Sequence, residues 1–397
     1  MRPLIYLSTF YPSQKRDFFL EKLLSAANIS ASAFSYSLLK GLVDCCHNNF
    51  NIVNTPLTGP YPISYRRLFT KESIDTECGY KIKSVGCCNL YGIQGPSISH
   101  NVSKAMRNLG IGDADILLYS IHLPLLKAAV AYKNKFKGSR IILVVPDLFE
   151  DISKQTPLKK MYRSLILGDF QKLCNSVDGY VLLTEQMLER MPVKKTYCVV
   201  EGIYNPMERR SGTKQNDKFN ILYTGMLYEK FGVKNLIDAV CSLNIPDVRL
   251  QLCGSGDLVD YIKEKSINDS CIEYKGIVPR ERVLELQCEA SLLVNPRQPN
   301  GGFTRYSFPS KNIEYLASGT PTLLYELEGI PQEYYKYCYH LSASQSSVDD
   351  LTEMIKQIYE TPLEERTALA KRAQSFIFTE KNASTQCAKI LHFIENL

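Results

Sequence analysis

The chain has 397 residues, of which 45% are hydrophobic and 22% charged, and its formal net charge is +6 at pH 7. This length suits two domains rather than one, and the composition is that of a folded globular protein, which excludes a disordered or low-complexity chain. Charged residues interrupt every apolar run before the roughly 18 residues that a membrane-spanning helix requires. We therefore expect no integral membrane segment, and we interpret the short apolar start as a strand rather than a signal peptide.

Cysteine and histidine usage points to a reduced compartment without a metal centre. The thirteen cysteines are odd in number and form no C-x-x-C pair, and the five histidines have no zinc-ligand spacing. We expect a cytoplasmic protein with no metal site.

Charge is distributed unevenly along the chain. Residues 1–205 hold 25 Lys and Arg against 16 Asp and Glu, a net charge of +9, whereas residues 206–397 hold 22 against 25, a net charge of −3. Basic and apolar residues alternate at helical spacing over 158–167, as they do in helices that lie on membrane surfaces. The first half is thus predicted to meet an anionic partner, with peripheral membrane contact; a solvated face of an ordinary helix explains 158–167 equally well.

The first half of the chain contains short β-rich runs separated by helical patterns. We predict its strands at Leu4–Leu7, Ile116–Tyr119, Arg140–Val145, Gly179–Leu183 and Tyr197–Val200. The stretch 48–94 is irregular and rich in Gly, Pro and Tyr, and we expect loops there.

The second half repeats this alternation more regularly. Its predicted strands are Asn220–Tyr223, Arg249–Leu252, Ile272–Tyr274, Ser291–Val294 and Thr322–Tyr325. Such βαβ units predict an α/β fold of two Rossmann-like, doubly wound domains that face a cleft. We place the first domain at 1–205 and the second at 219–375, with a linker over 206–218 between them and Gly202, just before the linker, as the candidate hinge. We expect a C-terminal helix at 376–397 to cross back to the first domain.

The most informative motif is the stretch from Phe308 to Pro321. Pro309 suits a first helical turn, Gly319 suits a left-handed stop, and Pro321 blocks continuation. The start of such a helix presents free N–H groups to a diphosphate. One turn further in, the acceptor-only carboxylate of Glu314 suits a ribose diol.

At these residues the sequence resembles the retaining GT-B glycosyltransferases of family four, in particular bacterial surface-polysaccharide enzymes. The resemblance lies in SFPSKNIEYLASGTP at Ser307–Pro321, preceded in the family's order by Tyr223–Ala239, Leu252–Asp257 and Tyr274–Val278. It is strong over 217–330 and weak in the first half. It implies that 219–375 binds a nucleotide-sugar donor and that 1–205 binds the acceptor.

The resemblance also implies roles for single residues. Gly225 would let a loop approach the nucleotide, and Lys230 would neutralise the phosphates as charge builds on the leaving group. A plain turn and a plain surface cation are the alternatives. The full implied donor set is Gly225, Lys230, Gly254, Val278, Ser307, Phe308, Pro309, Ser310 and Glu314.

Two positions depart from the family pattern. Tyr306 stands where many members have the first of two glutamates eight positions apart, and Met226 stands where many have an arginine. The phosphate site is therefore expected to depend on Lys230, on the helix start and on Arg297 or Lys311, although Lys311 is equally well explained as a structural surface cation.

In the first half, candidates for the acceptor or sugar side follow two predicted strands. Asp147 comes after Arg140–Val145, and His122 comes after Ile116–Tyr119; Tyr306 is a third candidate. Asp147 is interpreted as a ligand for a sugar hydroxyl, and with Lys230 and Glu314 it completes the predicted catalytic set. An Asp that caps the next helix and a structural His are the alternatives.

Together these patterns predict a retaining hexosyltransferase that needs no obligate metal or other cofactor. It would move a sugar from a nucleoside diphosphate donor, UDP favoured over GDP, to a glycan or polyprenyl-diphosphate-linked saccharide in the synthesis of capsule, O-antigen or exopolysaccharide. Two alternatives remain: a GT-B nucleotide-sugar epimerase, and a degenerate, non-catalytic partner or scaffold. Lys and Arg are dispersed rather than clustered, which excludes a nucleic-acid binder.

Overall fold

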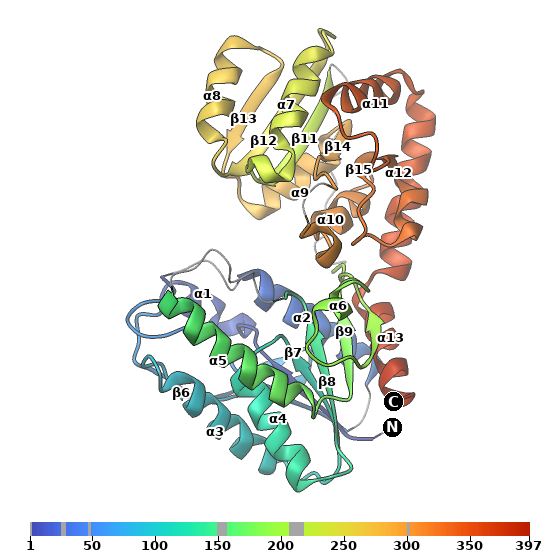
Figure 1. The fold of residues 1–397 in the computed structure, drawn as a ribbon. Helices are drawn as coiled ribbons and strands as arrows, with labels where there is room; N and C mark the ends of the chain where they lie inside the picture. Colours follow the sequence, from blue (N-terminus) through green and yellow to red (C-terminus); the bar gives the residue numbers. More distant parts are fainter. Residues whose placement is uncertain (1, 25–28, 47–48, 149–156, 206–217, 300–301) are drawn as a thin grey trace. The chain divides into compact units, whose positions relative to one another are not determined.

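The computed structural model (Figure 1) describes residues 2–24, 29–46, 49–148, 157–205, 218–299 and 302–397. These residues form two compact units. The N-unit comprises Met1–Ile203 and Ala383–Leu397, and the C-unit comprises Tyr204–Asn382. Most of the predicted linker, 206–217, lies outside the described residues.

The N-unit is built on an eight-stranded sheet in the order β10-β9-β8-β7-β1-β2-β5-β4. All neighbours are parallel except β4 and β5, which are antiparallel. The strands are β1 (Leu4–Ser8), β2 (Phe50–Asn54), β4 (Ser73–Glu77), β5 (Tyr80–Ser84), β7 (Asp115–Tyr119), β8 (Arg140–Val145), β9 (Gly179–Leu182) and β10 (Thr196–Val199). A separate antiparallel pair joins β3 (Phe69–Thr70) and β6 (Cys87–Cys88).

The prediction of loops over 48–94 is wrong, because five of these strands lie there. Polar residues conceal them in the sequence. Asn54 ends β2 fully buried, and its side chain accepts a hydrogen bond from Ser8 Oγ at 3.0 Å and donates to the carbonyl of Phe10 at 3.0 Å. In β4 the buried residues are Asp75 and Glu77, so the inward face of that strand reads as polar.

Helices cover both faces of the N-unit sheet (Figure 1). They are α1 (Arg16–Leu20), α2 (Ile29–Cys45), α3 (Gln94–Arg107), α4 (Leu123–Lys135), α5 (Pro157–Cys174), α6 (Met187–Arg190) and α13 (Ala383–Glu395), with the 3-10 helix η1 at Ser13–Lys15. One core cluster packs alternate residues of β1, β7 and β8 against α2 and α13.

The C-terminal helix begins later than predicted. The chain from Leu363 to Glu380 is one helix, α12, and it stays in the C-unit because Phe376 stacks on Tyr337 with ring centroids 4.3 Å apart. Only α13 returns to the N-unit, where it packs on α2. Gly41 of α2 allows this approach, since a Cβ atom there would collide with the carbonyl of Ala383.

The C-unit contains a six-stranded, fully parallel sheet in the order β13-β12-β11-β14-β15-β16. The strands are β11 (Phe219–Met226), β12 (Val248–Ser255), β13 (Ile272–Gly276), β14 (Leu292–Asn295), β15 (Thr322–Tyr325) and β16 (Tyr339–Leu341). This is the 3-2-1-4-5-6 order of a doubly wound fold, and the direction of winding reverses between β11 and β14. Ligands of such folds bind outside the carboxyl ends of the strands at this switch point.

The helices of the C-unit are α7 (Val233–Ser242), α8 (Val259–Asn268), α9 (Arg280–Glu289), α10 (Lys311–Ala317), α11 (Val348–Glu360) and α12, with the 3-10 helices η3 (Glu229–Phe231), η4 (Thr304–Tyr306) and η5 (Gln332–Tyr337). Ser347 starts α11 through a capping box with Asp350. Among the described helices, none combines the length and the apolar composition needed to cross a bilayer. All thirteen cysteines lie in described segments and are free thiols.

Candidate functional site

Two glycines mark the carboxyl edge of the C-unit sheet. Gly225 near the end of β11 has φ +137° and Gly254 near the end of β12 has φ +138°, a region that residues with a Cβ atom rarely adopt. The two lie opposite each other in the sheet, and a Cβ atom on Gly254 would collide with the carbonyl of Gly225. The backbone is therefore bare at this edge, beside the switch point.

Lys311, the first residue of α10, lies over this bare backbone. A Cβ atom on Gly225 would collide with its Nζ atom, and the same Nζ atom lies 6.0 Å from the centre of the Tyr223 ring. Burial lowers the pKa of Lys311; nearby Glu314 opposes this shift, and nearby Arg297 adds to it. The alternative of a plain surface cation does not fit a lysine folded back over the strand end.

Arg297 approaches the same place from the loop after β14. Its Nη2 atom donates to Ser307 Oγ at 2.6 Å, and its guanidinium lies 4.5 Å from the centre of the Phe303 ring. Its Nε atom is buried without a hydrogen-bond partner in the described part of the chain. Burial lowers the pKa of Arg297 to about 10, so it stays charged at neutral pH.

No carboxylate of the described residues forms an ion pair with either cation. Two buried or half-buried positive charges at one switch point repel each other, and this repulsion adds to the larger effect of burial on the pKa of Lys311. An anion placed between them would offset this repulsion and would accept hydrogen bonds from their N–H groups. The arrangement therefore suits a phosphate or diphosphate.

Lys230, the cation that the sequence predicted at the phosphates, lies on the surface of the C-unit. It belongs to η3, is exposed, and lies over the rings of Tyr228 and Phe231 at 5.5 and 5.1 Å. The η3 loop does approach the end of β14, because Gly232 lies against the carbonyl of Pro296. Lys230 thus lies beside the Phe231 ring that also meets Arg297 at 5.9 Å.

Glu314 lies in the first turn of α10, as predicted, but it already has a partner. Its Oε1 atom is 3.0 Å from Nη2 of Arg280, at the start of α9. Sequence reasoning missed Arg280, because nothing in its position after Pro279 links it to a residue so far along the chain. A ribose diol would have to share Glu314 with this arginine or displace it.

The segment around α10 differs in detail from the prediction. The helix begins at Lys311, so Pro309 and Ser310 precede it, although the carbonyl of Pro309 already accepts from the N–H of Asn312 at 2.9 Å. Gly319 has the predicted left-handed conformation, with φ +77°.

The remaining predicted donor residues have mixed environments. Phe308 is buried against Tyr334, at 5.3 Å between ring centres, so it supports the fold of this segment. Val278 packs on a core cluster beside α9, and Tyr306 ends η4 with the guanidinium of Arg305 over its ring at 5.3 Å. Their positions do not test the roles that the resemblance implies.

A hydrogen bond that the sequence did not reveal fixes α10 to the sheet. The fully buried hydroxyl of Tyr315 accepts from the backbone N–H of Thr224 at 2.9 Å. Because Thr224 directly precedes Gly225, this bond holds the strand end and the helix that carries Lys311 in one arrangement.

The carboxyl edge of the N-unit sheet holds the second group of candidates. Ser120, directly after β7, has φ +71°, a strained conformation for a residue with a side chain. The turn it makes leads to His122, the N-cap residue of α4. The Nδ1 atom of His122 is buried and has no partner in the described residues, and burial lowers the pKa of the ring to about 4. The alternative of a structural His, whose ring nitrogens would both have hydrogen-bond partners, therefore does not fit the described residues.

Asp147 follows β8 and lies near the end of β7. Burial raises the pKa of its carboxyl group, although part of the residue is exposed, and its charge in turn adds to the raised pKa of the buried Tyr119. The Tyr119 hydroxyl has no hydrogen-bond partner among the described residues. Residues 149–156, where a helix capped by Asp147 would begin, lie outside the described residues.

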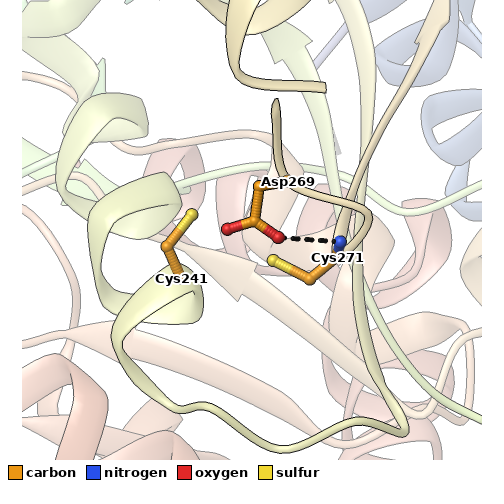
Figure 2. Close-up of side chains that lie close together, drawn as sticks. All are labelled: Cys241, Asp269 and Cys271. Carbon is orange, nitrogen blue, oxygen red and sulfur yellow. Dashed lines mark hydrogen bonds between the residues drawn. The ribbon is translucent and has the colours of Figure 1, made fainter. Parts of the chain in front are cut away.

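One group of thiol and carboxylate side chains is close enough to hold a metal ion: Cys241, Asp269 and Cys271, whose ligand atoms lie within 4.8 Å of one another (Figure 2). Asp269 accepts from the N–H of Cys271 at 3.0 Å, and this bond together with the two thiols lowers its pKa. Burial and the neighbouring carboxylate raise the pKa of Cys241 to about 11. The three groups thus satisfy one another. They lie at the end of α7 and just before β13, at the amino edge of the sheet and away from Gly225.

Comparison with known proteins agrees with this fold. Residues 205–376 match the family described as Glycosyl transferases group 1. No curated protein matches the sequence.

Solved structures with the same fold share little sequence with this chain. Sucrose-phosphate synthase from Thermosynechococcus elongatus has a TM-score of 0.65 at 12% identity, covering 100% of this chain and 99% of that one. The E. coli trehalose-6-phosphate protein bound with UDP-2-fluoro glucose has a TM-score of 0.63 at 12% identity, covering 99% of each chain. Anabaena HepE in complex with UDP has a TM-score of 0.61 at 11% identity, covering all of both chains.

These similarities establish the expected α/β architecture of two Rossmann-like halves, the GT-B fold. The family match lies over the C-unit, where the switch point and the two cations are found.

Proposed function

We propose that this chain is a retaining glycosyltransferase that takes a hexose from a UDP-sugar, and that its donor diphosphate is held by Lys311 and Arg297. The observation that carries the proposal is a pair of cations, without a carboxylate partner among the described residues, beside the bare backbone of Gly225 at the switch point of the C-unit sheet. Two positive charges and free N–H groups at one point are what a diphosphate requires.

The chemistry follows from where charge develops. As the bond between the sugar C1 and the diphosphate oxygen breaks, negative charge grows on the leaving diphosphate. Cations already fixed beside it stabilise this transition state more than the ground state. In the retaining reaction the acceptor hydroxyl attacks C1 from the same face, and its proton passes to the leaving phosphate oxygen.

The N-unit edge is proposed to meet the sugar and the acceptor. His122 is neutral at pH 7, so it can offer a hydrogen bond to a sugar hydroxyl or carbonyl without a net charge. Asp147 is proposed as the hydrogen-bond acceptor for a second hydroxyl. We place the reaction on the cytoplasmic side of a membrane, with a glycan or polyprenyl-diphosphate-linked saccharide of surface-polysaccharide synthesis as the acceptor.

The test is calorimetric binding of UDP and GDP, without added metal, to the native chain and to three variants. Lys311→Met is expected to weaken UDP binding by about 1.5–3 kcal/mol, as for loss of a charged hydrogen bond. Lys230→Met is expected to cost less, because Lys230 is exposed beside aromatic rings, and Lys371→Met, on an exposed face of α12, is the control.

Three outcomes would count against the proposal. Absence of binding to either nucleotide would favour a non-catalytic scaffold. A loss in Lys230→Met that exceeds the loss in Lys311→Met would move the phosphate site to η3. Conversion of a UDP-sugar to its epimer without an acceptor would favour the epimerase. Retention is tested separately, by the anomeric configuration of a transfer product measured by NMR.

A further inference from the structure

Exposed apolar side chains are concentrated in one part of the N-unit. Of the sixteen large hydrophobic residues that are exposed in the described chain, ten lie between Phe18 and Ile93, and the other six are scattered over 197–363. Single exposed apolar residues are ordinary, but a local concentration of this kind marks an interaction surface. We call its central members the apolar patch: Ile63, Leu68, Phe69, Leu90, Tyr91 and Ile93.

Backbone hydrogen bonds place the segments of the patch side by side. The N–H of Asn89 donates to the carbonyl of Leu68 at 2.7 Å, and the N–H of Tyr61 donates to the carbonyl of Asn89 at 2.7 Å. Phe69 pairs with Cys88 in the small β3–β6 sheet. The segments 61–69 and 88–93 therefore form one surface rather than two separate loops.

A buried polar network holds this surface from beneath. The side chain of Asn89 is fully buried, and it donates to the carbonyl of Arg67 at 3.0 Å and to Thr70 Oγ1 at 2.9 Å. It accepts from Thr58 Oγ1 and Gln94 Nε2, each at 3.0 Å. The exposed side chains thus project from an ordered scaffold, and Ile63, Phe69 and Tyr91 remain 66%, 62% and 62% exposed.

The charged residues within the segments that form the patch are basic, and the first carboxylate beyond them, Glu72, pairs with Lys83 at 3.0 Å. Arg66 and Arg67 directly precede Leu68 and Phe69, Lys71 follows them, and all three basic residues are exposed. No acidic residue occurs over 57–71 or 87–97, and no carboxylate in the described chain pairs with any of the three. On the neighbouring segment Asp17 and Glu21 are matched by Arg16 and Lys22, and Lys22 pairs with Glu21 at 3.4 Å.

We propose that the apolar patch, with Arg66, Arg67 and Lys71, is a docking surface for an anionic lipid bilayer. Apolar and aromatic side chains enter the boundary between headgroups and acyl chains, and adjacent Arg and Lys meet lipid phosphates. This combination of an apolar surface with unpaired cations fits a bilayer better than a protein partner, whose acidic groups would have to be placed against each cation. The inference extends the proposed function, since a lipid-linked acceptor must be reached at a membrane.

The surface differs from the one that the sequence suggested. Basic and apolar spacing over 158–167 predicted a membrane-surface helix, and α5 does form there, but most of its side chains in that stretch lie outside the described residues. The patch at 61–93 falls in the stretch where the sequence predicted loops.

The experiment is co-sedimentation of the full chain with vesicles of phosphatidylcholine alone or mixed with phosphatidylglycerol, without donor or acceptor. We expect binding to the anionic vesicles that weakens as salt is raised. Arg66→Gln/Arg67→Gln should lower the partition coefficient roughly 25-fold, at about fivefold for each charge removed. Phe69→Ser should lower it about tenfold or more, because a large apolar side chain no longer enters the lipid.

Matched controls come from the C-unit. Lys371→Gln/Arg372→Gln removes two exposed charges from α12, and Ile267→Ser removes an 84% exposed apolar side chain from α8. These variants should bind vesicles as the native chain does. Circular dichroism checks that every variant is folded.

Equal loss in the patch and control variants, or no binding to anionic vesicles, would overturn the inference. So would a patch-dependent dimer in sedimentation velocity, which would assign the surface to a second copy of the chain. Because lipid binding is measured without nucleotide, its failure would leave the proposed donor site untouched, and loss of UDP binding would leave the lipid result untouched.

Discussion

The carboxyl edges of the two sheets occupy equivalent places in two doubly wound units, yet different kinds of titratable group are buried at each edge. At the C-unit edge burial acts on two cations, Lys311 and Arg297, and Arg297 keeps its charge at neutral pH. At the N-unit edge burial favours the uncharged forms of His122 and Asp147.

The difference indicates what each edge can bind. Unpaired cations favour a polyanion, since each desolvated charge gains a partner when the ligand arrives. The neutral ring of His122 and the hydroxyl of Tyr119 each have a polar atom without a partner among the described residues, and such groups favour an uncharged polyol, whose hydroxyls both donate and accept. A nucleotide sugar has both parts, a diphosphate and a sugar.

The largest expected effect comes from filling the bare backbone of the C-unit edge. Gly225→Ala should weaken UDP binding by about a hundredfold, because the new Cβ atom needs an unfavourable backbone conformation and also displaces the Lys311 ammonium. Calorimetry measures the loss.

The matched control for this variant is Gly110→Ala. Gly110 has φ +68°, but nothing lies within 4 Å of the position that its Cβ atom would occupy. It should cost some stability and leave UDP affinity unchanged. Similar UDP affinities in the two variants would mean that Lys311 does not depend on Gly225, and the comparison of the two edges would lose its C-unit half.

A smaller effect is expected at the N-unit edge. His122→Ala should lower kcat by roughly tenfold to a hundredfold and leave UDP affinity unchanged, because the ring is proposed to meet the sugar rather than the diphosphate. Since the pKa of His122 is about 4, its titration should add no step to the activity profile between pH 5 and 8. Initial rates across this range with the native chain and the variant measure both effects.

Protein stability gives His122 a second readout with a definite sign. Burial depresses the folded-state pKa of His122 from the ordinary value of 6.5 to about 4, so the unfolded chain binds the proton more readily. The N-unit should therefore lose stability as pH falls from about 6.5 towards 4, and His122→Asn should lose less over the same window. Equal acid sensitivity of the two proteins would mean that the ring is not held neutral.

At both edges the sequence predicted the strands better than the side-chain contacts. Strands β8 and β15 lie where expected, because continuous apolar runs bounded by turn residues predict buried parallel strands. The predicted donor motif, Phe308–Pro321, depends on spacing within one short stretch of the chain. Two contacts were missed because they join residues far apart along the chain: the approach of Lys311 to Gly225 and the hydrogen bond from Thr224 to Tyr315. The burial of His122 Nδ1 without a partner among the described residues was missed because a local sequence pattern does not indicate burial.

The strands within 48–94 were missed for a related reason. Their buried positions include Asn54, Asp75 and Glu77, which are satisfied by partners elsewhere in the fold, such as Ser13 for Glu77 and Lys15 for Asp75. When the hydrogen-bond partner of a buried polar residue lies far away in the sequence, the local pattern predicts a loop at that residue. The patch proposed to meet lipid lies in this same stretch.

The smallest expected effect concerns Glu314. Its pair with Arg280 is half exposed, and such pairs contribute up to about 1 kcal/mol. If Glu314 binds the ribose, Arg280 competes for it, and Arg280→Gln should tighten UDP binding by up to about fivefold. Arg282→Gln is the matched control, because Arg282 lies on the same helix and pairs with Glu285 and Glu289 instead; it should leave UDP affinity unchanged.

The double variant decides between two roles for this arginine. If competition is the whole effect, Glu314→Gln and Arg280→Gln/Glu314→Gln should bind UDP equally, because without the carboxylate Arg280 has nothing to compete for. Weaker binding in Arg280→Gln alone would instead mean that Arg280 contacts the nucleotide, which would add a third cation to the C-unit edge and widen its contrast with the uncharged edge of the N-unit.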